Sequence, residues 1–392
     1  MTPSARVQAA IELLDQIIYA ARQKGAPADR LIASYFKQRR YAGSKDRRAV
    51  RELVYRAVRH CGPVPQSGRA VMLALAEVDE TLPALFDGSA HGPQSIGADE
   101  PAADAGLAPA WLVKKLEQSD IVGEAAVSLL SRAPLDIRVN ALKADCDTLE
   151  LPEAGDPLVA PNALRFPTGT NVEPWAAFRE GLIEVQDHGS QLICEAIPAR
   201  SGDTVLDLCA GAGGKTLALA ARFGNAISLL AADTDKRRLG NLAPRAARAG
   251  AAIDRTILLD PGREIEALDG LKGKVDHVLV DAPCSGTGTW RRNPEGRWRL
   301  DPAELARLTK LQDHVLDIAA ALVRQGGTVT FVTCSILDDE GPDRMKAFLE
   351  RHPRFQKETL DMPLGAPRGP GVRLEPFRDG TDGFFIATAR WA

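Results

Sequence analysis

The sequence lacks the features of a secreted, membrane-spanning or disulfide-bonded protein. No apolar stretch in its 392 residues approaches the roughly 20 residues that a membrane-spanning helix needs. Its first residues, MTPSARVQAAIELL, contain neither a long apolar run nor a cleavage site of small residues. The six cysteines are scattered, with no Cys-x-x-Cys pair and no Cys/His cluster at zinc spacing. We therefore expect a soluble cytoplasmic protein with reduced thiols, without a metal site or a membrane anchor.

Charge is unevenly distributed along the chain, although the net charge is only −3. Residues 37–60 carry nine Lys or Arg against two acids, whereas residues 70–113 contain seven acids and no Lys or Arg. A basic segment of this kind suits contact with RNA, and it equally suits a solvated helix face. Charge alone therefore leaves both interpretations open.

Hydrophobic periodicity predicts a small helical region at the N-terminus. Apolar residues recur at helical spacing over residues 4–24 and 44–60, and Pro27 suits the first turn of another helix over residues 27–38. A stretch rich in Gly, Pro, Ala and acids follows, without an apolar period, and predicts a linker. We expect a helical domain over residues 1–86, a linker over 87–108, a small α+β domain over 109–185 and a larger domain over 186–392.

From residue 186 onward, segments typical of strands and of helices alternate. Four apolar runs end in or near Asp207, Asp233, Asp260 and Asp281, and a fifth leads into Cys334. This alternation predicts a doubly wound α/β fold with a parallel sheet, in which ligands bind beyond the carboxyl ends of the strands. Both Cys334 and Cys284, which closely follows Asp281, fall at that edge.

The first of these strands runs into a Gly-rich turn, Cys209-Ala210-Gly211-Ala212-Gly213-Gly214-Lys215. A P-loop would need Gly at position 209, and a dinucleotide loop would need a third Gly where Thr216 stands, so both motifs are incomplete. An adenosine with an amino-acid tail fits better, because Asp233 follows Gly213 by 20 residues and suits ribose hydroxyls. Asp260 and Asp281 can hold adenine or amino groups.

Several carboxylates at strand ends favour a sulfonium cation over a triphosphate. We therefore predict S-adenosylmethionine as the cofactor. The alternative role for Asp233 is to cap the helix that begins near Asp235.

The two Cys-Ser pairs, at 284–285 and 334–335, indicate which atom receives the methyl group. Pyrimidine C5 is a weak nucleophile, but a thiolate that adds to C6 converts the ring into an enamine with a nucleophilic C5. A second thiol or another base can then help to release the product. We interpret Cys61, Cys146 and Cys194 as ordinary apolar residues, and Cys209 as a loop residue whose backbone touches the cofactor.

The segments DAPCSGTGTWRRNPEGRW and VTCSILDDE resemble the two cysteine motifs of the RsmB/Sun family of RNA (cytosine-5) methyltransferases. The resemblance extends to EGLIEVQDHGSQL, AADTDKRRL and DGFFIATARW and to the Gly-rich loop. It implies a class I, Rossmann-like methyltransferase sheet, a small RNA-facing α+β domain and an N-terminal NusB-like RNA-binding domain, which is short here.

The resemblance also implies roles for single residues. Cys334 would attack C6, and Cys284 would assist product release; in DNA cytosine methyltransferases the Cys of the Pro-Cys motif attacks instead, which would exchange the two roles. The cofactor would lie against the loop 209–215 with Asp233, Asp260 and Asp281. Asp281 would also face N3 and the exocyclic amine of cytosine.

The segment after Cys284 interleaves Arg291, Arg292 and Arg297 with two tryptophans, a pattern that suits phosphate contact and base stacking. The alternative is a surface loop whose Trp packs on the core. We predict an RNA cytosine-5 methyltransferase, and the resemblance implies rRNA as its substrate. The alternatives are a non-catalytic RNA-binding assembly factor and a P-loop-like NTPase that uses Lys215.

Overall fold

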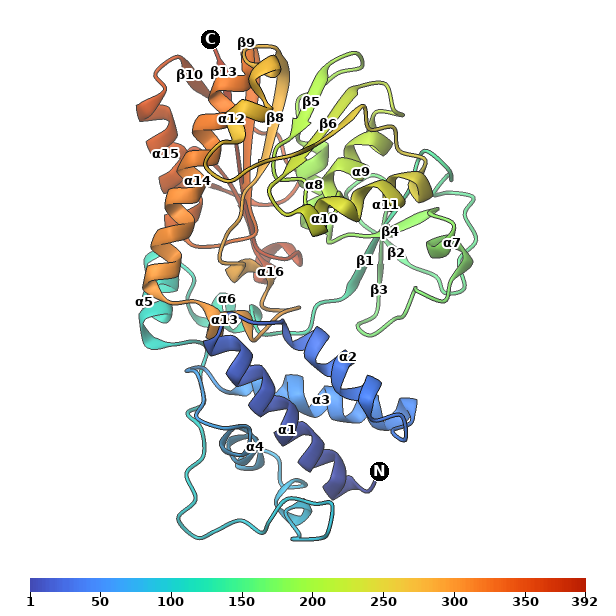
Figure 1. The fold of residues 1–392 in the computed structure, drawn as a ribbon, viewed down its shortest axis with the longest axis vertical. Coiled ribbons are helices and arrows are strands. Elements are labelled where there is room, and N and C mark those ends of the chain that lie inside the picture. Colours follow the sequence, from blue (N-terminus) through green and yellow to red (C-terminus); the bar gives the residue numbers. More distant parts are fainter. The chain divides into compact units, whose positions relative to one another are not determined.

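The computed structural model describes residues 1–392, and the chain forms two compact units (Figure 1). The first combines Met1–Ser131 with Thr289–Pro302, and the second combines Arg132–Gly288 with Ala303–Ala392. The chain thus leaves the second unit shortly after Cys284, contributes one segment to the first unit, and returns. None of its helices has the length and apolar character needed to cross a membrane.

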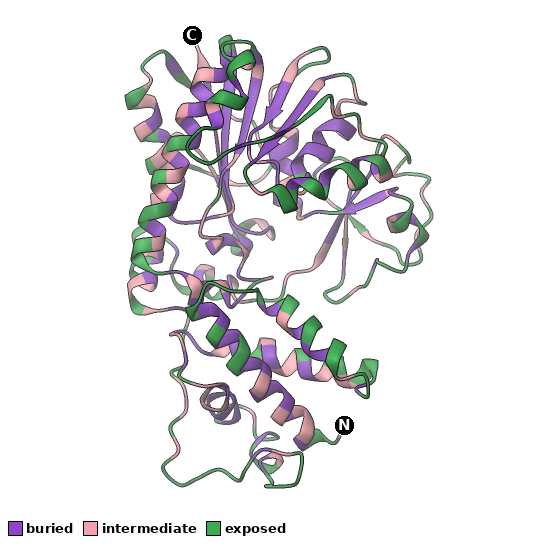
Figure 2. Ribbon diagram, in the orientation of Figure 1, coloured by how far each residue is buried: buried purple, intermediate pink, exposed green.

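The first unit is helical, as the hydrophobic periodicity predicts. The three helices expected near the N-terminus are present, with ends within two residues of the expected ones. Figure 2 shows how buried and exposed residues alternate along α1, whose apolar side is covered by the other helices. The elements of this unit are α1 (Pro3–Arg22), α2 (Ala28–Gln38), α3 (Ser44–His60), α4 (Gly68–Ala76), η1 (Pro83–Leu85), α5 (Ala110–Gln118), α6 (Gly123–Ser128) and α13 (Gly296–Arg299).

The stretch expected to be a linker, residues 87–108, belongs to the first unit. Ser4 Oγ of α1 donates a hydrogen bond of 2.6 Å to Asp87, and Cys61 pairs with Ala105 in an isolated β-bridge. Composition indicates that this stretch has no helix of its own. It does not reveal the hydrogen bonds that attach irregular backbone to neighbouring helices.

A small antiparallel sheet with strand order β2-β3-β1-β4 occupies the first part of the second unit. Its central strand β1 pairs with both β3 and β4. The carboxylate of Glu184 in β4 forms ion pairs with Arg245, at 2.8 Å, and with Arg248, both from α11, so the small sheet is attached to the larger one. Its elements are β1 (Leu135–Val139), β2 (Asp156–Pro157), β3 (Ala163–Phe166), α7 (Ala176–Arg179) and β4 (Ile183–Val185).

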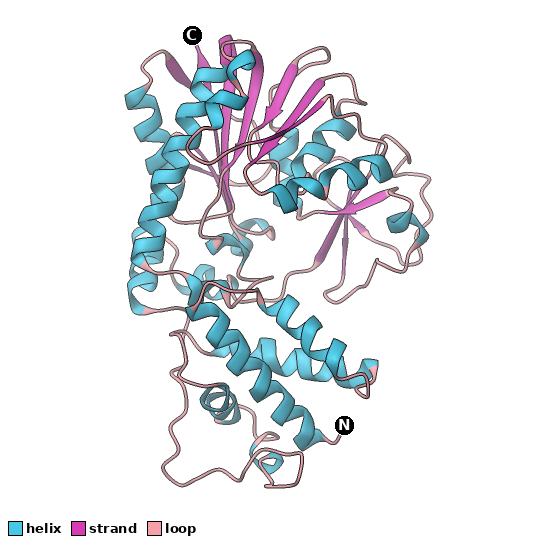
Figure 3. Ribbon diagram, viewed as in Figure 1, coloured by secondary structure: helices cyan, strands magenta, loops and turns pink.

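The large sheet has nine strands in the order β11-β12-β13-β9-β8-β5-β6-β7, with β10 also paired to β13. Figure 3 distinguishes the strands of the structure from its helices. Strands β5 to β9 are parallel, whereas β13 runs antiparallel to β9. The strands are β5 (Thr204–Asp207), β6 (Ser228–Asp233), β7 (Arg255–Leu258), β8 (Val275–Asp281), β9 (Val323–Thr333), β10 (Phe355–Glu358), β11 (Ala366–Arg368), β12 (Gly371–Leu374) and β13 (Phe384–Trp391).

Helices cover both faces of this sheet, as expected of a doubly wound fold. Leu206 and Val278 face a core shared with α14 and α15, whereas Val205 and Leu279 face a core shared with α8 and α9. Burial on both faces explains the continuous apolar runs in the sequence. The helical elements here are α8 (His188–Glu195), α9 (Gly214–Arg222), α10 (Lys236–Gly240), α11 (Leu242–Ala249), α12 (Glu264–Ala267), η2 (Asp269–Leu271), η3 (Thr287–Thr289), α14 (Pro302–Leu322), η4 (Asp338–Glu340), α15 (Pro342–Arg351) and α16 (Pro376–Asp379).

Candidate active site

The two thiols singled out in the sequence lie side by side. Strands β8 and β9 are parallel neighbours, with Asp281 opposite Val332, so the loops that follow them start at the same edge of the sheet. The Sγ atoms of Cys284 and Cys334 are 3.2 Å apart and share a hydrogen bond. Neither thiol is part of a disulfide.

The surroundings of Cys284 disfavour its thiolate form. The hydrogen bond with Cys334, burial, and the negative charges of Cys334 and Glu340 raise the pKa of Cys284 well above its usual value. These surroundings oppose ionisation of Cys284, and either sulfur can be the donor in the hydrogen bond between the two thiols.

Hydroxyl groups join the two cysteine loops. Thr287 Oγ1 lies 2.9 Å from Ser335 Oγ and accepts a hydrogen bond of 3.2 Å from the backbone N–H of Ile336. The N–H of Gly288 donates to the carbonyl of Cys334 at 3.0 Å. Because these groups are buried and bonded across the loops, both thiols sit on backbone that is fixed in place.

The Gly-rich loop after β5 depends on two glycines. Gly211 and Gly213 have φ angles of 55° and 86°, a region that favours glycine. A Cβ atom at Gly213 would overlap the side chain of Leu242. The carboxylate of Asp233 accepts hydrogen bonds of 2.7 Å from the N–H groups of Gly211 and Asp235. Asp233 therefore fixes the loop itself, while the cap of α10 is Asp235.

Asp207, at the end of β5, has a buried oxygen atom without a partner. Its Oδ2 accepts a hydrogen bond of 2.7 Å from Thr216, but its Oδ1 has none. Burial raises the pKa of Asp207 to about 7; the bond from Thr216 opposes this shift, and the charge of Asp281 adds to it. An unsatisfied buried acceptor beside a Gly-rich turn fits the ammonium group of an amino-acid tail, as S-adenosylmethionine carries.

Lys215 and Asp281 form a pair between the Gly-rich loop and the cysteine loops. Lys215 Nζ lies 2.6 Å from Asp281 Oδ2 and 5.8 Å from the ring centre of Phe384. Burial opposes the charge of Lys215, but the Asp281 carboxylate outweighs it and raises the pKa of the lysine to about 12. Lys215, which the sequence predicted as a cofactor-binding residue, is thus paired with a carboxylate of the chain itself.

The remaining residues predicted for the cofactor loop line the same turn. The N–H of Ala210 donates to the carbonyl of Ala232 at 2.9 Å, and the carbonyl of Ala212 accepts from Arg245 at 2.8 Å. Burial raises the pKa of Cys209 well above its usual value, which agrees with a structural thiol. Asp260 is exposed and follows β7, the outermost strand of the sheet, so that β8, β5 and β6 separate its strand from β9, which leads into Cys334.

The structure corrects the prediction that Arg297 contacts RNA. Its side chain is fully buried inside the first unit, where it donates hydrogen bonds to the carbonyls of Val58 at 2.6 Å and Cys61 at 2.8 Å. The last carbonyls of a helix lack partners within that helix, and Arg297 supplies donors to them at the end of α3. Burial lowers the pKa of Arg297 to about 10.

The residues near Arg297 differ in exposure. Trp298 lies in the core of the first unit and donates from Nε1 to the Cys61 carbonyl at 3.1 Å, which is the alternative considered for this segment. Arg291 is 6% exposed, whereas Arg292 is partly exposed. Of the three arginines, Arg292 is therefore the one most accessible to an RNA phosphate.

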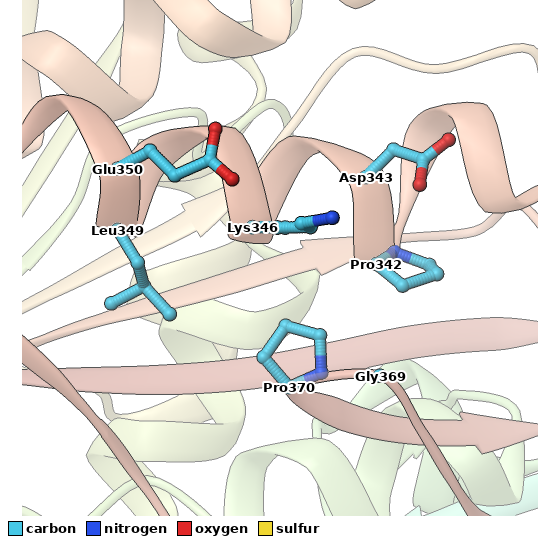
Figure 4. Close-up of a pocket in the computed structure, with 7 residues that line it drawn as sticks. All are labelled: Pro342, Asp343, Lys346, Leu349, Glu350, Gly369 and Pro370. Atoms are coloured by element: carbon cyan, nitrogen blue, oxygen red, sulfur yellow. The ribbon is translucent and has the colours of Figure 1, made fainter.

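A cavity of about 400 Å³ opens between α15 and the turn that joins β11 to β12. Figure 4 shows Lys346 and Leu349 of α15 on one side and Pro370 of the turn on the other. None of the residues predicted for catalysis, cofactor binding or RNA binding lines this cavity. No group of three or more His, Cys, Asp and Glu side chains is placed to hold a metal ion.

Sequence reasoning missed three buried residues of this site: Asp207, Gln312 and Glu340. Asp207 has a sequence signal, because it is the acid that ends the first strand of the large sheet. Gln312 lies within a long helix and Glu340 follows two other acids, so neither stands out from residues of a solvated surface. Only the fold shows that both are fully buried.

Comparisons with known proteins identify the family to which this chain belongs. Residues 195–390 match the family described as 16S rRNA methyltransferase RsmB/F. Ribosomal RNA small subunit methyltransferase B of Citrobacter koseri is 34% identical over 289 residues, and the probable protein of that name from Bacillus subtilis is 33% identical over 302 residues. Each alignment covers 72% of this chain and 66% of the relative, so the chain spans about two thirds of the length of these relatives.

The likeness extends to the fold. The crystal structure of PH0851 matches with a TM-score of 0.76 at 24% identity, covering 100% of this chain and 99% of that one. The family description names a methyltransferase, the enzyme class predicted for this chain, and not an NTPase. The chain belongs to the RsmB/F family of rRNA methyltransferases, and the predicted family and α/β methyltransferase fold are confirmed.

Proposed function

We propose that this chain transfers a methyl group from S-adenosylmethionine to carbon C5 of a cytosine in small-subunit rRNA, in the cytoplasm. The observation that carries the proposal is the pair of thiols 3.2 Å apart at the ends of β8 and β9. Strand β8 also pairs with β5, which leads into the Gly-rich loop. The relatives' names, which specify small-subunit rRNA, support the substrate.

Cys334 is the nucleophile in this proposal. Its thiolate forms a bond to C6 of the cytosine, and the electron pair that moves to C5 takes up the methyl group. A base then removes the proton from C5, the bond between Cys334 and C6 breaks, and the thiolate is regenerated. Cys284, held beside Cys334, assists this last step.

The cofactor supplies an electrophilic methyl group on a sulfonium ion. Gly211 and Gly213 let the backbone approach its amino-acid tail, and Asp207 offers the unpaired Oδ1 to its ammonium group. Asp233 holds the loop in shape through Gly211. Asp281, partly exposed and paired with Lys215, provides a carboxylate on the side of the loop that leads to the thiols.

RNA contact is proposed for exposed basic residues. In the first unit, Lys45, Arg48 and Arg51 of α3 are exposed, and Arg292 is partly exposed. Such side chains release counterions from phosphates, so binding should weaken as salt increases.

The test is methyl transfer from radiolabelled S-adenosylmethionine to small-subunit rRNA and, separately, to partly assembled small subunits. We expect label in RNA, and 5-methylcytidine after digestion to nucleosides and mass spectrometry. Label in another nucleoside would contradict the proposed chemistry. RNA binding without any transfer to either substrate would favour the non-catalytic assembly factor.

A further inference from the structure

A buried carboxylate, that of Glu340, contacts the loop that carries Cys284. Glu340 is 0% exposed. Its Oε1 accepts hydrogen bonds from the Ser285 N–H at 2.8 Å and from Gln312 Nε2 at 3.0 Å, and its Oε2 accepts from the Ser285 hydroxyl. All three partners are neutral donors. Both carboxylate oxygens of Glu340 therefore act as acceptors for groups at the Cys284 loop and α14.

Gln312 holds the other side of the same loop. Its Nε2 donates to the Pro283 carbonyl at 2.9 Å as well as to Glu340, and its side chain is fully buried in α14. The peptide groups before and after Cys284 are therefore each bonded to one of two buried side chains, which also bond to each other. This arrangement leaves the Cys284 backbone little freedom to move away from Cys334.

The same contacts place the Glu340 carboxylate against Ser285, the residue that follows Cys284. The Glu340 charge opposes ionisation of Cys284, and the backbone N–H of Ser285 is occupied by Glu340. A thiol that keeps its proton can donate a hydrogen bond to its neighbour, and the neighbour is Cys334. The two Cys-Ser pairs thus become unequal through a residue that lies six positions after Cys334.

We propose that Glu340 is a positioning residue that assigns the roles of the two thiols: acting through Ser285 and together with Gln312, it holds Cys284 opposite Cys334 and places its own carboxylate on the Cys284 loop, so that Cys334 becomes the nucleophile. The inference rests on the proposed function, because that function defines one thiol as the nucleophile and the other as the group that assists product release. The difference in reactivity between the thiols is a property of the protein alone and can be measured without RNA or cofactor.

The test is alkylation of the whole native chain by iodoacetamide at pH 8, with the rate at each cysteine followed by peptide mass spectrometry. In the wild type, we expect Cys334 to react faster than Cys284. Glu340→Gln keeps the size of the side chain and removes its charge, so Cys284 should react about tenfold faster, the change in thiolate fraction for one pKa unit. Glu340→Asp, which retains the charge, should keep Cys284 slow.

Glu264→Gln is the matched control, because Glu264 is also a buried carboxylate of the second unit and bonds to His314 at 3.1 Å. It should leave the ratio of the two rates unchanged. The inference is overturned if folded Glu340→Gln shows the wild-type ratio. If that variant does not fold, Ser285→Ala, which removes the hydroxyl bond alone, should shift the ratio in the same direction by a smaller factor, and an unchanged ratio there would equally overturn it.

Discussion

The loops after β8 and β9 both place a Cys-Ser pair at the end of a buried parallel strand, but they continue differently. The Cys334 loop passes through η4 to α15 and stays within the second unit. The Cys284 loop leads into residues 289–302, which belong to the first unit. The Cys334 loop therefore carries the Glu340 carboxylate, and the Cys284 loop bonds to that carboxylate through Ser285.

Two Cys-Ser pairs at the ends of neighbouring strands therefore have different surroundings in this structure. Proline precedes Cys284 and threonine precedes Cys334, yet both thiols reach the same edge of the sheet. What separates them is the hydrogen bonds of the neighbouring residues, above all Ser285 with Glu340. The following predictions test that separation.

The largest effect is expected from Cys334→Ala. Without the thiol that attacks C6, methyl transfer should fall by at least about 10³-fold, because no other group supplies the covalent step. RNA in which cytosine carries fluorine at C5 should form no denaturant-resistant adduct with this variant, whereas the wild type should form one. If Cys334→Ala still formed the adduct, Cys284 would be the nucleophile and the proposed roles of the two thiols would be exchanged.

A smaller loss, roughly 10²-fold in turnover, is expected from Cys284→Ala, because the first methyl transfer is preserved and only product release is impaired. With unmodified RNA, the covalent complex should therefore accumulate and be visible on a denaturing gel. A variant that releases product at the wild-type rate would remove Cys284 from the mechanism.

The segment that follows the Cys284 loop contains a buried arginine, Arg297, and a partly exposed one, Arg292. Comparing Arg297→Met with Arg292→Ala tests whether the first contributes to stability and the second to RNA binding. Arg297→Met should lower the free energy of unfolding by about 3 kcal/mol, because buried carbonyls at the end of α3 lose their donors. Arg292→Ala should leave thermal stability nearly unchanged and reduce the salt dependence of RNA binding by about one counterion. The reverse pattern would restore Arg297 as an RNA ligand.

The smallest effect concerns Asp207, at the end of the neighbouring strand β5. Its folded pKa of about 7 lies above the usual value for an Asp, so ionised Asp207 is fully available only above that pH. The affinity for S-adenosylhomocysteine, which carries the same ammonium group, should rise about tenfold between pH 6 and pH 8. Calorimetric titrations should show that Asp207→Asn removes this rise, and a pH profile like that of the wild type would exclude Asp207 from binding.

Three features could be predicted from the sequence: the parallel sheet, the Gly-rich loop after its first strand, and the location of both thiols at one edge of the sheet. Each depends on a local pattern, namely apolar strands, a Gly-rich turn or a Cys-Ser pair. The burial of Arg297 could not be predicted from the sequence. An arginine that contacts RNA and an arginine that binds buried carbonyls can stand in the same sequence pattern. The burial of Glu340 and Gln312 could not be predicted for the same reason, because it depends on how α14 packs against the cysteine loops.

The segment 289–302 also sets an order of events during synthesis. Arg297 bonds to Val58, 239 residues earlier, and the N–H of Ala28 bonds to Glu295, 267 residues later. At about 5–20 residues per second, the helices of the first unit wait roughly 10–50 s for the residues that complete their core. The N-terminal unit is therefore translated first and completed late, and during that interval the carbonyls at the end of α3 and the apolar site of Trp298 are open to water or to a chaperone.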